Sequence, residues 1–152
     1  GWQLSGVISA YNGQPFTVTA SNTSLNAQAS SQRANCNGTP KKLGDNLQFY
    51  DKSTFSVPVN GQLGTCGYNS LVGPGVVNLD LGLDRNFKLT ERFQLKFRAE
   101  AFNAANTPHH ANPNSTQASV SNSAFMQVTD IRNTGRDGLD ERTFRLGLRL
   151  VW

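Results

Sequence analysis

The stretch VVNLDLGLDRNFKLTERFQLKFRAEAF, residues 76–102, decides the fold class of this chain. Large apolar residues alternate with polar residues in two runs, 76–87 and 93–102, which the five residues KLTER at 88–92 separate. A period of two is typical of β-strands with one apolar and one polar face, and helical spacing fits neither run. The stretch therefore predicts an antiparallel hairpin of two long strands joined by a tight turn.

Two further runs, near the two ends of the sequence, alternate in the same way. Residues 2–10 place Trp2, Leu4, Ile8 and Ala10 on one face. FRLGLRLVW, residues 144–152, continues the alternation to the last position. Chain termini usually fray unless they are tied down, so we expect the last strand to be a paired, structural member of the sheet.

Long polar stretches connect these strands, at 11–76 and 103–142, and both are rich in Asn, Ser, Thr, Gly and Pro. Within them, GQPFTVTAS at 13–21 and SAFMQVTDIR at 123–132 predict short additional strands. No repeat or interdomain linker is evident. We therefore expect an all-β fold of antiparallel strands with long polar loops, in a single β segment over residues 1–152.

Composition and motifs exclude several classes of function. The net charge is +4, but the sequence has no Lys/Arg run and no nucleic-acid-binding motif, so we expect no nucleic-acid partner. Nucleophile, zinc-protease, Walker and dinucleotide motifs are all missing, so we expect neither an enzyme nor a cofactor. The sequence has neither a signal peptide nor an apolar run of about 20 residues, and we expect a chain that was processed or cut from something longer.

The two cysteines, Cys36 and Cys66, lie in polar surroundings. In an oxidising compartment we expect them to form a disulfide that restricts the long loop by about 3–4 kcal/mol, with two free thiols as the alternative. No metal is expected: neither cysteine belongs to a CxxC motif, and His109 and His110 are adjacent to each other. The acidic residues and glycines of 130–142 would suit calcium, but EF-hand spacing is absent and a solvated turn is favoured.

The alternation is compatible with a soluble sheet or with the wall of an outer-membrane barrel. The barrel is favoured because its strands need about 9–11 residues, which the runs at 76–87 and 93–102 provide. With the KLTER turn in the periplasm, both long loops fall on the extracellular side, as the barrel architecture requires. Trp2, Trp152 and the two phenylalanines that flank the turn, Phe87 and Phe93, then fit a periplasmic aromatic belt.

Charged residues on the polar face of the hairpin would point into the lumen of such a barrel. They are Asp80, Asp84, Lys96, Arg98 and Glu100. They could contact a plug or a solute. The favoured interpretation is cross-strand charge pairing, worth about 0.2–1 kcal/mol a pair, and Arg145 and Arg149 are interpreted in the same way.

Several blocks together resemble one family. They are GQPFTVT at 13–19, NSLVGPG at 69–75, NLDLGLDRNF at 78–87, LTERFQLKFRAEAFNAANTPH at 89–109 and the final aromatic strand. In this order they resemble the C-terminal region of TonB-dependent outer-membrane receptors. The most similar group is the Oar-like receptors, which carry a carboxypeptidase-regulatory-like domain.

The resemblance implies a bacterial outer-membrane barrel of about 22 strands, filled by a plug, that imports a nutrient with energy passed through TonB. This chain would supply the closing wall and outer loops, and its partners would be membrane lipid and the remaining barrel and plug of a parent chain. Trp152 would match the terminal aromatic read by the barrel-assembly machinery. The loop carrying Cys36 and Cys66 departs from the family pattern, in which no fixed cysteine pair is expected there.

Two alternatives stay open at this point. One is a secreted, soluble β-sandwich that binds glycan or protein through exposed aromatics, namely Tyr11, Phe16, Tyr50 and Tyr68. The other is a self-assembling structural protein whose strand edges pair between copies.

Overall fold

The computed structural model describes residues 1–21, 29, 31–132 and 141–152, in which the regular structure is β apart from one 3-10 turn, η1 (Lys52–Thr54). The strands are β1 (Trp2–Tyr11), β2 (Pro15–Phe16), β3 (Thr19–Ser21), β4 (Ser31–Arg33), β5 (Asn35–Cys36), β6 (Phe55–Ser56), β7 (Leu71–Val72), β8 (Val76–Lys88), β9 (Gln94–Phe102) and β10 (Thr143–Val151). The predicted all-β, antiparallel fold class is confirmed. None of the described residues forms a helix long and apolar enough to cross a membrane.

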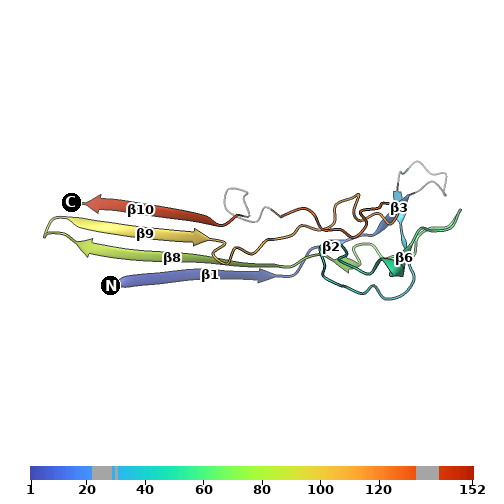
Figure 1. Ribbon diagram of the computed structural model, residues 1–152, viewed down its shortest axis with the longest axis horizontal. Coiled ribbons are helices and arrows are strands. Elements are labelled where there is room, and N and C mark those ends of the chain that lie inside the picture. The colour runs from blue at the N-terminus through green and yellow to red at the C-terminus, as the bar shows by residue number, and fades with distance from the viewer. Residues whose placement is uncertain (22–28, 30, 133–140) are drawn as a thin grey trace. The chain divides into compact units, whose positions relative to one another are not determined.

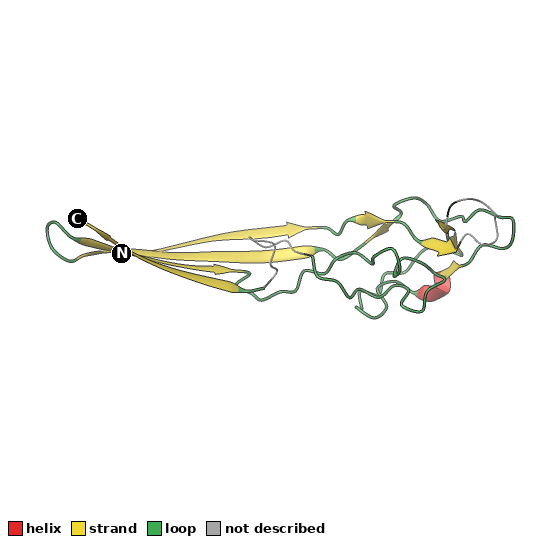
Figure 2. Cartoon of the chain, turned by 90° about the horizontal axis from the view of Figure 1, so that it is seen from above, coloured by secondary structure: helices red, strands yellow, loops and turns green. Residues whose placement is uncertain are grey.

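The chain divides into two compact units. The sheet unit comprises Gly1–Tyr11, Val76–His109 and Arg132–Trp152, and the loop unit comprises Asn12–Gly75 and His110–Ile131. The first contains the four long strands, and the second contains the short ones together with η1. The loop unit is mostly loop, with a few short strands (Figure 2).

The sheet unit is built on a four-stranded antiparallel sheet in the order β1-β8-β9-β10 (Figure 1). The pairing of β1 with β8 runs from Trp2 opposite Arg85 to Tyr11 opposite Val76. The pairing of β9 with β10 starts at Phe102 opposite Thr143. Both long connections therefore leave the sheet at the same end, which is opposite the turn between β8 and β9. The four long strands predicted from alternation are confirmed, with bounds that move by at most one residue.

Backbone and hydroxyl hydrogen bonds close the short turn. The Leu89 N–H donates to the Phe93 carbonyl at 3.0 Å, and the Thr90 hydroxyl accepts from the Phe93 N–H at 3.1 Å. The turn therefore runs from Leu89 to Phe93, because Lys88, the first residue of KLTER, still belongs to β8.

In the loop unit, the two long connections hydrogen-bond to each other. The Thr19 N–H donates to the Ala118 carbonyl and the Phe49 N–H to the Met126 carbonyl, each at 2.9 Å. The two connections also share a hydrophobic core. It consists of Phe16, Val18, Ala20, Ala34, Phe49, Tyr50, Phe55, Cys66, Leu71, Ala118, Phe125, Met126 and Val128. The unit thus has a packed interior of its own although it contains little regular structure.

Two expectations for the connections need correction. Residues 13–21 do not form one strand but two short ones, β2 and β3. The strand expected over 123–132 is wrong, because residues 123–126 form turns and the rest of the segment makes only an isolated bridge at Ile131. Met126 has a φ of 64°, which no extended strand allows, and the Asn122 side chain accepts from the Ala124 N–H at 2.8 Å.

Candidate functional site

The register of the long sheet sorts its side chains onto two faces. The apolar face consists of Trp2, Leu4, Gly6, Ile8, Ala10, Val77, Leu79, Leu81, Leu83, Arg85, Phe87, Leu95, Phe97, Ala99, Ala101, Phe144, Leu146, Leu148 and Leu150. The polar face carries the alternate residues of the same strands. Directly opposed residues of neighbouring strands point to the same side of a sheet. The apolar and polar faces predicted for each strand are therefore continuous across all four strands.

Large side chains of the apolar face are exposed. Leu4 is 73%, Ile8 74% and Leu146 78% accessible. Monomeric water-soluble proteins rarely expose a contiguous apolar surface of this kind. Among the described residues no second sheet covers these side chains, and this finding argues against the β-sandwich alternative.

The polar face carries an ion-pair cluster at its centre. The Arg98 guanidinium lies 2.6 Å from a Glu100 carboxylate oxygen and 3.8 Å from one of Asp84. All three belong to the charged set predicted from sequence. Their side chains are partly exposed, so in water each pair contributes little to stability.

Asp80, another predicted charged residue, organises the end of strand β9. One of its carboxylate oxygens accepts from the Asn103 N–H at 2.9 Å and from the Asn78 amide at 3.0 Å. Asn103 is buried with a φ of 47°, and its side chain bonds the backbone N–H and carbonyl of Thr107. Asn103 was not among the predicted site residues, although asparagine is one of the non-glycine residues that most readily take a left-handed conformation at such a turn.

The last charged residue of the predicted set, Lys96, faces another cation. Lys96 lies opposite Arg149 in the β9–β10 register. Directly opposed like charges destabilise a sheet, so this rung lowers the stability of the sheet.

An aromatic cluster surrounds Arg85, the one charge on the apolar face. The Arg85 guanidinium lies 4.9 Å from the ring centre of Trp2 and 4.5 Å from that of Phe87. The Trp2 ring also packs edge-on against Phe87 and Phe97, at 6.2 and 5.9 Å. Trp2 and Phe87 were expected in an aromatic belt and lie together, whereas Phe93 is in the turn and Trp152 lies exposed beyond β10.

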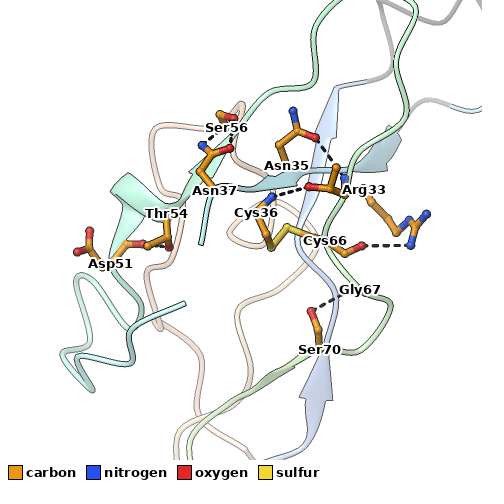
Figure 3. Close-up of a disulfide and its surroundings, with 11 residues drawn as sticks. Arg33, Asn35, Cys36, Asn37, Asp51, Thr54, Ser56, Cys66, Gly67 and Ser70 are labelled. Atoms are coloured by element: carbon orange, nitrogen blue, oxygen red, sulfur yellow. Dashed lines mark hydrogen bonds between the residues drawn. A yellow bond between two sulfur atoms is a disulfide. The ribbon is translucent and has the colours of Figure 1, made fainter. Parts of the chain in front are cut away.

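A disulfide joins Cys36 to Cys66 in the loop unit, as expected (Figure 3). The Cys36 N–H donates to the Thr65 hydroxyl, and the Arg33 guanidinium donates to the Cys66 carbonyl, both at 3.1 Å. The Thr65 N–H in turn donates to the Asn35 side chain at 3.2 Å. The disulfide thus sits inside a hydrogen-bonded pairing of two loop segments, and the Cys66 side chain belongs to the core of the unit.

The histidines and acidic residues do not assemble into a metal centre in the part of the chain that the structure describes. Buried His109 donates from Nε2 to the Val77 carbonyl at 3.0 Å, whereas His110 lies 3.3 Å from the Asn46 amide. Asp130 accepts from the Asn114 amide at 3.2 Å. Most of the acidic segment considered for calcium, residues 133–140, lies outside the described residues.

The aromatic platform expected for a glycan-binding module is wrong for two of its four members. Phe16 and Tyr50 are buried in the loop-unit core, with ring centres 6.2 Å apart. The Tyr50 hydroxyl also donates to the Val72 carbonyl at 3.0 Å, so it has no free polar end. Tyr11 and Tyr68 are exposed, but they belong to different units.

Comparison with known proteins identifies the class. The chain matches, over residues 1–145, the family described as an outer membrane beta barrel domain. It therefore belongs to this family of membrane-embedded barrels, which places it in the outer membrane. No curated protein and no solved structure matched the chain.

Proposed function

We propose that the sheet unit is a wall segment of a TonB-dependent outer-membrane transporter for nutrient uptake, and that the loop unit is its extracellular part. The observation that carries this proposal is the two-faced sheet, whose large exposed apolar side chains lie on one face except for Val7 and Tyr11. The apolar face contacts lipid, and the polar face lines the lumen. Further strands of a parent chain pair with the outer edges of β1 and β10, which have one neighbour each in this sheet.

The polar face supports the presence of a plug or an anionic solute. The rung formed by Lys96 and Arg149 places two cations opposite each other, and an acidic group in the lumen would relieve their repulsion. Arg98, in contrast, already has two acidic neighbours. The plug contact is therefore assigned to the turn end of the polar face. Trp152 is assigned separately, as the terminal aromatic that the barrel-assembly machinery reads.

Photo-crosslinking in the outer membrane of living cells tests the two faces. A photoreactive amino acid at Leu146, on the apolar face, is expected to capture lipid. The same amino acid at Arg149, on the polar face, is expected to capture protein of the barrel or plug. Capture of a second copy of this chain at Leu146 would instead favour the self-assembling alternative and would contradict the wall assignment.

Surface labelling tests the orientation. An epitope inserted next to Gly61, in an exposed turn of the loop unit, should bind antibody on intact cells. An epitope inserted at Glu91, in the short β8–β9 turn, should bind only after the outer membrane is opened. The reverse pattern would place the long connections in the periplasm and overturn the assignment.

A genetic comparison tests the energy source. Deletion of this protein and deletion of TonB should produce the same growth defect on a scarce nutrient, with no further defect in the double deletion. If deletion of this protein causes a further growth defect in cells that already lack TonB, the barrel acts without TonB-driven transport.

A further inference from the structure

The apolar face contains a cation that no acidic side chain balances. Among the described residues, Arg85 takes part in no ion pair, and its guanidinium lies over the rings of Trp2 and Phe87. Ring faces attract a cation but do not accept the directed hydrogen bonds of a guanidinium. On a surface that faces lipid, Arg85 therefore needs an anionic oxygen acceptor from outside the chain.

The position of Arg85 along strand β8 brings its side chain within reach of lipid phosphates. Arg85 lies eight residues after Val77, the first apolar-face residue of this strand. At a rise of about 3.4 Å per residue and a tilt of about 40°, this separation spans about 21 Å, against an apolar band of about 25 Å in such barrels. Arg85 therefore lies near the edge of the band, on the side of the short turn.

A trough lies on the same face, next to this cluster. Its floor is formed by Ala99 and Ala101 of β9, and its sides by Leu81 and Leu83 of β8 and by Phe144 and Leu146 of β10. The hollow has a volume of about 220 Å³ and is lined mainly by apolar side chains. It forms because two small residues in the middle strand stand between bulky residues in the neighbouring strands.

The trough leads toward the Arg85 cluster. Phe97 lies two residues before Ala99 on β9 and directly opposite Arg85 on β8. A molecule with an anionic group at Arg85 can therefore extend an apolar chain past Phe97 and along Ala99 and Ala101. This direction leads from the edge of the apolar band toward its middle.

We propose that the apolar face binds one glycerophospholipid, with its phosphate on Arg85 and an acyl chain in the trough over Ala99 and Ala101. This inference rests on the proposed function, because the face must meet lipid and the short turn must lie in the periplasm. The bound molecule then belongs to the inner leaflet of the outer membrane. Charge complementarity at Arg85 and continuity of the trough with the lipid-facing surface select a phospholipid over a soluble anion.

Native mass spectrometry of the detergent-solubilised full-length protein tests the site. Phosphatidylglycerol is titrated against the wild type and against Arg85→Gln and Ala99→Leu, which remove the cation and fill the trough. Matched controls are Arg98→Gln, which removes a cation that already has acidic neighbours from the opposite face, and Ala10→Leu, which adds the same bulk outside the trough. A basic side chain near anionic headgroups contributes about 1 kcal/mol, so Arg85→Gln should weaken retention about fivefold.

Two further ligands separate the sources of the signal. Digalactosyl-diacylglycerol carries the same acyl chains without phosphate, and it should bind the wild type and Arg85→Gln equally. Inorganic phosphate should not displace phosphatidylglycerol, because it cannot occupy the trough. Displacement by inorganic phosphate would show a simple anion site and overturn the proposal.

The outcomes also distinguish this inference from the proposed function. Equal losses in Arg85→Gln and Arg98→Gln, or in Ala99→Leu and Ala10→Leu, would overturn the phospholipid site. If Leu146 crosslinks to lipid in cells but wild-type protein retains no phospholipid, the site fails while the wall assignment stands. If Leu146 captures no lipid, both fail together.

Discussion

The sheet unit and the loop unit treat hydrophobic side chains in opposite ways. In the loop unit, Phe125 is 3% and Met126 0% accessible, whereas in the sheet unit Phe144 is 65% and Leu148 70% accessible. The same residue types are buried from water in one unit and exposed in the other. The difference shows that the two units are made for different solvents, because apolar surface is stable either inside a core or against lipid.

The largest effect is expected from the core of the loop unit. Phe125→Ala should lower the free energy of unfolding of that unit by about 3–5 kcal/mol, because it opens a cavity next to Phe55, whose ring centre is 5.6 Å away. Hydrogen exchange at the Phe49 amide, which donates to Met126, measures the change. Phe144→Ala is the matched control and should leave this amide unaffected. Equal effects of the two substitutions would remove the contrast between the units.

The disulfide should give the next largest effect. Replacement of Cys36 and Cys66 by alanine should destabilise the loop unit by about 3–4 kcal/mol, since the cross-link restricts its unfolded state. Hydrogen exchange in the loop unit should rise, while exchange in β8 and β9 stays the same. A reducing agent should reproduce the effect in the wild type and should not change the variant. Loss of protection in the long sheet as well would contradict the independence of the two units.

A charge on the apolar face should destabilise only the membrane-inserted state. Leu146→Arg should cost about 2–4 kcal/mol near the middle of the bilayer, because the charge loses its hydration. Urea unfolding from lipid vesicles measures this cost. Val7→Arg makes the same chemical change on the polar face and should have nearly no effect. If Val7→Arg is the more damaging substitution, the assignment of the faces is inverted.

The smallest effect is expected in acid, at Asp51 in the loop unit. Hydrogen bonds from the Ser53 backbone N–H and hydroxyl hold the pKa of Asp51 below its usual 3.8. Because the pKa is lower in the folded state, ionised Asp51 stabilises the unit above pH 3.8, and this contribution is lost as the pH falls through the folded-state pKa. Asp51→Asn should therefore flatten the acid limb of a stability–pH curve. An unchanged curve would show that these hydrogen bonds do not persist in solution.

The sequence predicted the sheet well because its information is local. Alternation specifies a strand and its faces one residue at a time, so β1, β8, β9 and β10 could all be found. The same pattern also marked Asp84, Arg98 and Glu100 as residues of one face, and the structure brings them together. Cys36 and Cys66 could be paired because the chain has no other cysteine.

The loop unit could not be predicted because its contacts are distant in sequence. Thr19 bonds Ala118 and Phe49 bonds Met126 without any periodic pattern to reveal the pairing. The burial of Tyr50 depends on such contacts, and a tyrosine in a polar stretch gives no sign of it. Arg85 was missed for a different reason. It interrupts the apolar residues on its face of β8, and the pattern of alternation assigns no role to a residue that interrupts it.

The disulfide also affects the order in which the sheet can assemble. Strands β1 and β8 are neighbours in the sheet but are separated by the connection 12–75. A bond between residues 36 and 66 bypasses much of this connection and roughly halves the chain length that must close, which favours closure by about 0.6 kcal/mol. Oxidation before insertion would thus make β1 meet β8 sooner and leave the aggregation-prone edge of β8 open for less time.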